Sequence, residues 1–485
     1  MIGAGPAGLA AAVTAADLGL RCALLDAGAR TGGQFYRHPA PGLGAARPER
    51  LHHAWSAYTG LADRLAAHRE AGRVDLLGNH QVWALERAGD TAWAVHATLG
   101  PGADDRATVR AGAVLLATGA YERQLPFPGW TLPGVVTAGG AQAMLKSGLV
   151  LPGRRIVVAG SGPLLLAAAS SLVTAGAEVP AVVEATNYLG YARRPHVLAG
   201  VPAKLAEGLV HGTAFLRHRV RLRRRAAVVE AHGTDRVTGV TIARLDARWR
   251  PVPGTEKRIE CDALAVGHGL LPQIELATEA GAETVAGPDG AVALKVDAGL
   301  RTTVPGLWAA GETCGVGGAD LAIAEGELAA HAVAGATARG SVLRRRARLR
   351  AFADLMAAAH RPGPGWTGWL RPDTDVCRCE EVPAAAITEA VEELGAGDAR
   401  TVKLLTRAGM GWCQGRMCGP AVACLSGMSG SPGRTAVPCP ARCRWRSWRR
   451  EPPGRPATAR EPGPAVNPRF RSRAAGTLVS ARAVQ

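Results

Sequence analysis

Residues 3–8 read Gly-Ala-Gly-Pro-Ala-Gly, the spacing G-x-G-x-x-G of a dinucleotide-binding loop. An alanine- and leucine-rich stretch typical of a helix follows this loop. The stretch RCALLDA at 21–27 is then typical of a buried strand, and it contains Asp26 eighteen positions after Gly8. The order of glycine loop, helix, strand and acidic residue predicts a nucleotide-binding βαβ unit rather than a ligand-free glycine-rich turn.

Each residue type in the loop has a physical role in this prediction. Gly3 allows the tight turn, Gly5 lets the backbone approach a pyrophosphate, and Gly8 lets the helix pack closely on the strand. Pro6 and Ala7 begin the helix, whose free N–H groups would face the pyrophosphate. Asp26 is expected to accept hydrogen bonds from the ribose hydroxyls.

Only Met1 and Ile2 precede the loop, although the first strand of such a unit should have about five or six residues. We therefore expect that the start of this sequence is truncated or misplaced.

A second unit of the same kind is predicted around residues 154–184. RRIVVA at 154–159 indicates a strand, Gly160 and Gly162 form the loop, and a strand ends at Glu184 after an apolar helix. Leu165 stands where the third glycine should be, which weakens the assignment of NAD to this site. Both a bound dinucleotide and a vestigial fold element remain open.

Further markers surround these units. The segments VLLATG (114–119) and LWAAGE (307–312) each predict a buried strand that ends in a small turn. Glu312 is a candidate for binding the ribityl chain of a flavin. The helix expected from Gly317 onward would present its N-terminal dipole to a reduced flavin ring.

Together the stretches GAGPAG, GGQFYR, LLATGAYER, LPFPGWTLPGVVTAGGAQ, AGSGPLLL and LWAAGE resemble the flavoproteins of the glutathione-reductase type. More narrowly, residues 1–425 resemble the FAD-binding subunits of heteromeric amine and amino-acid dehydrogenases, a group with opine oxidase, hydrogen cyanide synthase and sarcosine oxidase subunits. The resemblance implies FAD in the first site and leaves NAD open in the second. It also implies a separate D-amino-acid-oxidase-like flavoprotein subunit that holds the small amine substrate. Further cofactor-binding residues implied by the resemblance are Gly33, Gln34, Thr118, Gly119 and Gly311.

A thiol-reducing member of this architecture needs a pair of redox cysteines beside the flavin. No C-x-x-C or C-x4-C pair occurs before residue 377, and Cys314 stands alone. The sequence therefore disfavours a disulfide reductase.

Four cysteines near the C-terminal end form two close pairs, C-x-C and C-x4-C, separated by 33 residues. Two predicted helices lie between the pairs and would bring four thiolates to one point. The ligands Cys377, Cys379, Cys413 and Cys418 suit either zinc or an iron–sulfur cluster, but C-x-C is tight for structural zinc. The motif CRCE…GWCQGRMCG resembles the bacterioferritin-associated-ferredoxin-like domain, so a [2Fe–2S] cluster is preferred. Arg378 and Arg416 would offset its negative charge, unless they are ordinary solvated residues.

The predicted fold class is α/β, with two Rossmann-like dinucleotide-binding domains of the glutathione-reductase type and a small helical [2Fe–2S] domain. The expected segments are the first part of the FAD domain (1–125), the NAD-type domain (126–290), the return of the FAD domain (291–343), a linker (344–372), the [2Fe–2S] domain (373–425) and a tail (426–485).

The net charge of +17 does not indicate a nucleic-acid-binding face, because residues 419–485 alone carry +10 and the first 418 residues carry only the remaining +7. Their Arg- and Pro-rich composition predicts disorder or a frameshift soon after Ala423, with Cys424, Cys439 and Cys443 accidental. No signal peptide or transmembrane run is evident, so a cytoplasmic protein is expected.

These observations predict one subunit of an oxidoreductase that oxidises C–N bonds. Electrons from an amino acid or secondary amine would pass through flavin and the cluster to an external acceptor. The alternatives are a self-contained NAD(P)H-dependent reductase and a non-enzymatic scaffold. No catalytic residue is assignable: His268 is expected to be structural, whereas Tyr121, Glu122 and Arg123 would face the flavin by resemblance.

Overall fold

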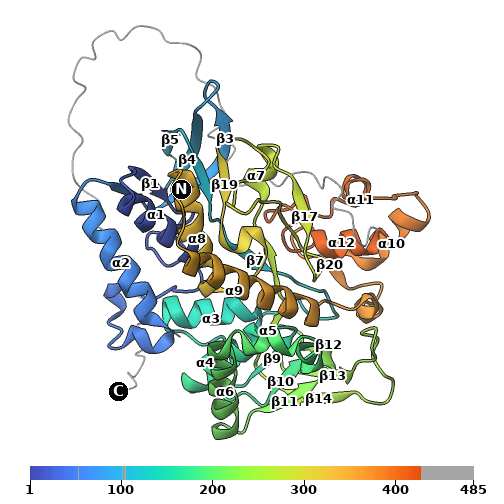
Figure 1. Ribbon diagram of the computed structural model, residues 1–485. Coiled ribbons are helices and arrows are strands. Elements are labelled where there is room, and N and C mark those ends of the chain that lie inside the picture. Colours follow the sequence, from blue (N-terminus) through green and yellow to red (C-terminus); the bar gives the residue numbers. More distant parts are fainter. Residues whose placement is uncertain (53, 101, 103–104, 428–485) are drawn as a thin grey trace, which may run out of the picture. The chain divides into compact units, whose positions relative to one another are not determined.

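The first unit of the computed structural model is built on a parallel sheet (Figure 1). The structure describes all residues except 53, 101, 103–104 and 428–485. Strand β1 (Cys22–Leu25) pairs with β2 (Val74–Leu77), and β6 (Val114–Leu116) pairs with β19 (Leu307–Ala309). Ile2 joins the two pairs through parallel bridges to Leu25 and Leu116. Strands from before residue 120 and after residue 306 thus share one sheet.

Two helices of this unit lie side by side in Figure 1: α1 (Pro6–Asp17) and α8 (Ala319–Val333). Alanines fill most of the space between them. A Cβ on Gly326 of α8 would overlap the carbonyl oxygen of Ala7, so glycine is required for this close approach. On the other side of α1 packs α2 (Trp55–Glu70).

The second unit has a parallel sheet with the order β11-β10-β9-β15-β8. Its central strands β9, β10 and β15 are wholly buried, as expected for a sheet covered on both faces. The bounds of its strands and main helices are β8 Val135–Thr137, β9 Ile156–Gly160, β10 Ala181–Glu184, β11 Arg221–Arg224, β15 Ala263–Gly267, α3 Ala138–Gly148, α4 Leu164–Thr174 and α6 Pro202–Arg217.

Antiparallel ribbons complete both units, and the sequence analysis did not anticipate them. One three-stranded sheet follows β2 and a second follows β11. Of two further ribbons, β7 with β16 pairs segments far apart in the sequence, whereas β17 with β18 is a local hairpin. Their bounds are β3 His80–Arg87, β4 Trp93–Leu99, β5 Asp105–Ala111, β12 Ala226–His232, β13 Gly239–Arg244, β14 Lys257–Glu260, β7 Ala120–Glu122 with β16 Leu270–Pro272, and β17 Thr284–Ala286 with β18 Val292–Leu294. Short helices are α5 Pro195–Ala199, α7 Glu275–Glu279, η1 Pro41–Leu43, η2 Pro48–Leu51, η3 Tyr188–Arg193 and η4 Gly311–Cys314.

The C-terminal described part is the small helical module that the sequence predicts. It comprises β20 (Asp375–Cys377), β21 (Val382–Pro383), α10 (Ala384–Glu392), α11 (Ala399–Thr406) and α12 (Gly419–Leu425). Its buried residues join the core of the second unit. Ile387 of α10 is buried, whereas Leu394 follows the end of this helix and its side chain is 59% exposed.

The stretch expected to be a helix end and linker is helical over much of its length. Helix α9 spans Gly340–Ala359, and the 3₁₀ helix η5 spans Pro364–Trp369. Trp366 and Trp369 of η5 are buried in the core that the second unit shares with the C-terminal module. The segment therefore packs as part of the fold. The expected tail at 426–485 lies outside the described residues from 428 onward.

Candidate functional site

The first glycine loop has the backbone geometry of a phosphate cradle. Gly3 lies at φ +101°, and a Cβ there would overlap the carbonyl oxygen of Ala117. A Cβ on Gly8 would overlap the carbonyl oxygen of Gly3, which explains the third glycine. In contrast, a Cβ on Gly5 would meet nothing nearer than Gly33 Cα at 3.9 Å. Because Pro6 begins α1 and no side chain caps it, the helix end can bind an anion.

Asp26 lies where β1 ends and contacts this loop. Its carboxylate accepts the N–H of Ala4 at 2.6 Å and the N–H of Gly28 at 2.7 Å. Burial raises the pKa of Asp26, while these two N–H groups oppose the shift. The side chain is only half-buried, so its remaining lone pairs are open to a ribose.

The backbone at Gly33 packs directly against the first glycine loop. It is held at φ +58°, and a Cβ there would be 2.8 Å from Gly5 Cα. Its neighbour Gln34 turns outward, where its side-chain oxygen accepts hydrogen bonds from Arg37 at 2.8 and 3.2 Å. The structure thus brings Gly5, Asp26 and Gly33 together and leaves the Gln34 side chain engaged with Arg37.

The turn after β6 (118–119) and the turn after β19 (311–312) are held by different contacts. Thr118 donates its hydroxyl to the carbonyl of Gln273 at 2.7 Å, and Gly119 has open space where a Cβ would be. Gly311 packs against the first turn of α1, because its Cβ would be 2.9 Å from the Cβ of Ala7. Glu312 accepts the N–H groups of Gly317 and Gly318 at 3.1 and 2.8 Å, so its carboxylate orders the loop before α8.

The sequence analysis missed Glu325, a buried residue of α8 that holds the turn at Gly311 in place. It is 0% exposed and accepts the N–H of Gly311 at 3.0 Å. Two arginines of α9 compensate its charge: Arg350 at 2.8 Å and Arg346 at 3.3 Å. An acidic residue in the middle of the largely apolar stretch ADLAIAEGELAA, followed by arginines four apart, was the available signal.

The donors of this first site fit FAD. The cradle that a Cβ would fill, the uncapped N-terminus of α1 and the carboxylate of Asp26 supply what a pyrophosphate and an adjoining ribose need. The residues that would hold the group are Gly3, Gly5, Pro6, Ala7, Gly8, Asp26 and Gly33, with Thr118, Gly119, Gly311 and Glu312 at the turns beside them.

The second glycine loop resembles the first in its backbone, but the acidic residue beside it is buried. Gly160 and Gly162 lie at φ +133° and +113°. Glu184 ends β10, and its carboxylate accepts the N–H of Gly162 at 3.1 Å. Unlike Asp26, Glu184 is 0% exposed. Leu165, which replaces the third glycine, is buried in the core beneath the loop. The residues at this second site therefore do not fit a ribose without rearrangement.

The four predicted cluster ligands come together between two loops. Cys377 and Cys379 belong to the turn from β20 to β21, whereas Cys413 and Cys418 lie between α11 and α12. Cys377 and Cys418 are each 1% exposed, and the other two thiols are half-buried. A Cβ on Gly411 would overlap that of Cys379, so glycine permits the close packing of the loops.

The thiols meet as two pairs. Cys377 and Cys418 lie close enough to shift one another's pKa, and so do Cys379 and Cys413. The Cys418 thiol, followed by backbone N–H groups that include that of Gly409, lowers the pKa of Cys377 to about 5. The Cys377 thiol, together with burial, raises the pKa of Cys418.

Four thiols are the donor set that a [2Fe–2S] cluster needs, because such a cluster takes two thiolates on each iron. The donor set of Cys377, Cys379, Cys413 and Cys418 fits that group, and its buried N–H donors and shielded thiols would tune its potential.

The two arginines near the thiols are not free charges. Arg416 donates to Glu275 of α7 at 3.0 Å, and this glutamate is 6% exposed. Arg378 lies over the Trp130 ring at 5.4 Å. The charge of Arg416 is thus compensated by a buried carboxylate.

Residues 121–123 also differ from expectation. Glu122 accepts the N–H groups of Gly139 and Gly140 at the start of α3, and Arg123 forms an ion pair with Asp289 at 2.7 Å. Both side chains are therefore engaged in holding the fold. Burial, and then the charge of Glu275, raise the pKa of Tyr121. His268 is 2% exposed and lies among aromatic rings.

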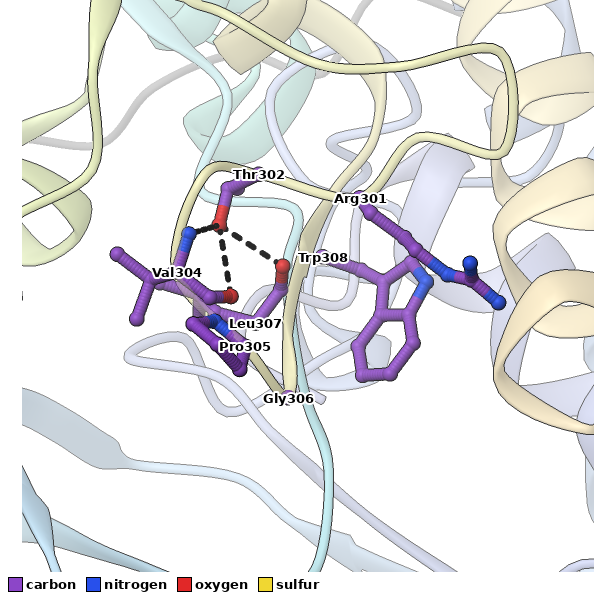
Figure 2. A pocket seen from close by; sticks show the side chains of 7 residues that line it. All are labelled: Arg301, Thr302, Val304, Pro305, Gly306, Leu307 and Trp308. Atoms are coloured by element: carbon purple, nitrogen blue, oxygen red, sulfur yellow. Dashed lines mark hydrogen bonds between the residues drawn. The ribbon is translucent and has the colours of Figure 1, made fainter.

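A small hollow of about 200 Å³ lies at the turn before β19, away from these sites (Figure 2). Thr302 holds the turn, because its hydroxyl donates to Leu307 O at 2.9 Å and accepts from Val304 N at 3.2 Å. The Thr302 hydroxyl is thus used by the backbone of this turn. Its lining residues are Arg301, Thr302, Val304, Pro305, Gly306, Leu307 and Trp308.

Family comparisons agree with both sites. The family described as pyridine nucleotide-disulphide oxidoreductase matches residues 1–336, and the BFD-like [2Fe-2S] binding domain matches residues 376–425. These matches confirm the predictions of FAD, of a [2Fe–2S] cluster and of the fold class. Among the described helices, none is long and apolar enough to cross a membrane.

Two curated relatives match most of the chain. Hydrogen cyanide synthase subunit HcnB of Pseudomonas aeruginosa is 35% identical over 435 residues, covering 86% of this chain and 90% of that protein. An opine oxidase subunit from Agrobacterium tumefaciens (strain Ach5) is 35% identical over 438 residues, covering 87% and 84% respectively. The L-proline dehydrogenase from P. horikoshii shares the fold, with a TM-score of 0.62 at 18% identity over 90% of this chain and 74% of that one.

Proposed function

Because the chain belongs to the pyridine nucleotide-disulphide oxidoreductase family and carries a [2Fe–2S] module, we propose that it is one subunit of an amino-acid or amine dehydrogenase. In this function, electrons from the oxidation of a C–N bond pass through the flavin and the cluster to an external acceptor. The chain itself is an FAD-dependent oxidoreductase. Its substrate, its partner and the acceptor belong to the proposal.

One observation carries the proposal: the loop that bears two cluster ligands packs on the ribbon that leaves the first nucleotide unit. Arg416 lies between Cys413 and Cys418 and binds Glu275, which follows β16. Strand β16 pairs with β7, and β7 begins directly after Thr118 and Gly119. The flavin side and the cluster side are therefore joined by direct contacts within one chain.

The cofactors supply the redox chemistry, since FAD takes up two electrons and releases them singly to a one-electron cluster. The residues of this chain would bind the nucleotide and shield the cluster from water. The α1 N-terminus and Asp26 would hold the nucleotide, and the buried positions of Cys377 and Cys418 exclude water from the cluster. The ion pair between Arg416 and Glu275 ties the cluster loop to α7.

Disulfide reduction is not part of the proposal, despite the family description. Cys314 has no second cysteine beside it, and its Sγ lies 3.9 Å from the Thr313 hydroxyl. Burial raises the pKa of Cys314, which keeps the thiol protonated and unreactive.

The partner is inferred from the relatives, both of which are named as subunits. We expect a D-amino-acid-oxidase-like flavoprotein that binds the small amine and oxidises it. A cytoplasmic location is also part of the proposal, and cell fractionation tests it.

The test is co-expression of this chain with an amine-oxidase-like flavoprotein encoded beside it, followed by co-purification. We expect a flavin band, a reducible [2Fe–2S] signal in electron paramagnetic resonance (EPR), and amine-dependent reduction of a dye. Cys413→Ser should remove the EPR signal and the dye reduction but keep FAD. Cys424→Ser, in the same module, is the matched control and should retain all three.

Two results would contradict the proposal. A flavin band without any reducible cluster signal in the unmodified complex would remove the electron outlet. Rapid reduction of the flavin by NADH alone would instead favour a self-contained reductase.

A further inference from the structure

The two glycine loops of this chain can be compared directly, because each has an acidic residue at the end of its second strand. Asp26 accepts N–H groups from its loop and from Gly28, two residues further on. Glu184 does the same with Gly162 at 3.1 Å and Thr186 at 3.1 Å. The backbone arrangements are equivalent, so a difference in binding must come from what covers each carboxylate.

The first carboxylate is open, whereas the second is sealed by a histidine that follows α9. His360 is 7% exposed, and its Nδ1 lies 3.5 Å from the Glu184 carboxylate and 3.0 Å from the Thr186 hydroxyl. The Nε2 of the same ring lies 3.0 Å from the Tyr191 hydroxyl. Both ring nitrogens are thus satisfied inside the chain.

The histidine also contacts the glycine loop itself. The Ser161 hydroxyl donates to the carbonyl of His360 at 3.3 Å. Ala359 packs on Gly190, where a Cβ would be 3.0 Å from the Cβ of Ala359. The end of α9 therefore rests on the loop after β9 and on η3 after β10.

Helix α9 is held in this position from its other side. Arg346 and Arg350 bind the buried Glu325 of α8, and Arg350 also donates to the carbonyl of Gly315 at 3.0 Å. The helix is therefore tied to the first unit by charge and to the second unit by His360.

A second layer covers the neighbouring strand end. Trp369 of η5 stacks on Trp249 with parallel rings 6.1 Å apart and donates its N–H to the Trp249 carbonyl at 3.0 Å. His268, directly after β15, lies against both rings. Ligands of open α/β sheets bind at the carboxyl ends of the strands, and here these ends are occupied by the chain itself.

We propose that the second dinucleotide fold is closed by its own chain, with His360 in the place of a ribose on Glu184, so that the site does not take NAD(H). The donors toward Glu184 that a ribose would supply come from Thr186 and His360 instead. An incoming nucleotide would have to displace His360 and break its contacts with Ser161, Thr186 and Tyr191. The second fold is then a structural support, and the flavin receives electrons from a donor other than NADH.

Titration of the FAD- and cluster-loaded protein with NADH tests the proposal directly, with nucleotide fluorescence and flavin absorbance as readouts. We expect that NADH does not bleach the flavin, and that any binding of NADH is the same in the unmodified protein and in the Glu184→Ala variant. Micromolar binding of NADH to the unmodified protein that is lost in Glu184→Ala would overturn the proposal.

A second experiment tests whether removal of the His360 ring improves the binding of NADH. His360→Ala should uncover Glu184 and tighten NADH binding by about tenfold or more, which corresponds to roughly 1.4 kcal/mol. His331→Ala on α8 is the matched control, since its ring bonds only the carbonyl of Glu327 one turn earlier. If His360→Ala retains its FAD and its circular dichroism but binds NADH no better than His331→Ala, His360 does not fill the ribose position.

Discussion

Gly33 and Gly72 offer a clean comparison of two single residues in the first unit. Both lie at positive φ, +58° and +66°, so alanine costs similar backbone strain at either position. Only at Gly33 would the new Cβ meet another backbone, 2.8 Å from Gly5 Cα, whereas Gly72 has open space. We expect Gly33→Ala to weaken FAD binding by about tenfold or more, because displacing packed backbone costs roughly 1–3 kcal/mol.

The measurement is the dissociation constant of FAD from the apoprotein, followed by flavin fluorescence. Gly72→Ala should bind FAD like the unmodified chain. Equal affinities of the two variants would mean that Gly33 does not shape the cradle.

His268 makes the stability of the fold depend on pH. Complete burial lowers its pKa to about 3, below the value near 6.5 of an unfolded chain. The folded state therefore stays unprotonated while the unfolded state takes up a proton, so stability is lost as pH falls from about 6.5 toward about 3. The slope that this group contributes is about 1.4 kcal/mol per pH unit.

We expect His268→Gln to remove about one proton from the uptake on unfolding, and so to lower the slope of stability against pH between pH 4 and 6. The measurement is urea unfolding followed by tryptophan fluorescence. The comparison uses slopes, so a uniform loss of stability in the variant does not affect it. Identical slopes would show that His268 already carries a proton in the folded state.

Local spacing explains which single residues could be predicted. Asp26 and the four cysteines were placed by short motifs, and the structure brings each group together. Glu325 and His360 could not be found in this way. His360 meets Thr186 across 174 residues of sequence, and no periodicity in the sequence encodes such a pairing.

Among secondary-structure elements, the cluster loop and α7 are held by one buried ion pair. Glu275 has a second carboxylate oxygen that is buried without a hydrogen bond, so removing its partner leaves the charge uncompensated. We expect Arg416→Gln to destabilise the module by about 2–3 kcal/mol, less than for a fully buried pair because Arg416 is partly exposed. The temperature at which the visible absorbance of the cluster is lost should fall by about 5 °C.

Arg407→Gln is the matched control. Arg407 pairs with Glu380 at 2.9 Å in the same module, but its side chain is 69% exposed. An exposed pair is worth at most about 1 kcal/mol, so this variant should melt almost normally. A similar loss in both variants would mean that the Glu275 contact does not hold the module.

Helices with an apolar stripe could be predicted from the sequence, whereas other elements could not. The buried spacing of α4, α10 and α11 indicates helices at the positions where the structure has them. In α9 only Ala353 and Leu355 are buried, so its arginine-rich sequence lacks a clear stripe. Its position is set by Arg346, Arg350 and His360, which bind residues on other elements.

Across the full chain, every residue that builds the FAD cradle and the thiol site lies between residues 3 and 418. The expected sequence error after Ala423 falls at the end of α12, and Cys439 and Cys443 lie outside the described residues. If those two thiols are accidental, cofactor content cannot depend on them. We expect a chain ending at Gly427 to bind FAD and [2Fe–2S] with unchanged stoichiometry.

The measurement is flavin absorbance and iron content per chain, with the reduced EPR signal, in the shortened and the full-length protein. A full-length variant with Cys439→Ser and Cys443→Ser separates loss of thiols from loss of chain. If this double variant loses the EPR signal, a distal cysteine replaces one of the four proposed ligands. If only the shortened chain loses it, the missing residues stabilise α12 against the ligand loop, because Gly419 begins this helix immediately after Cys418.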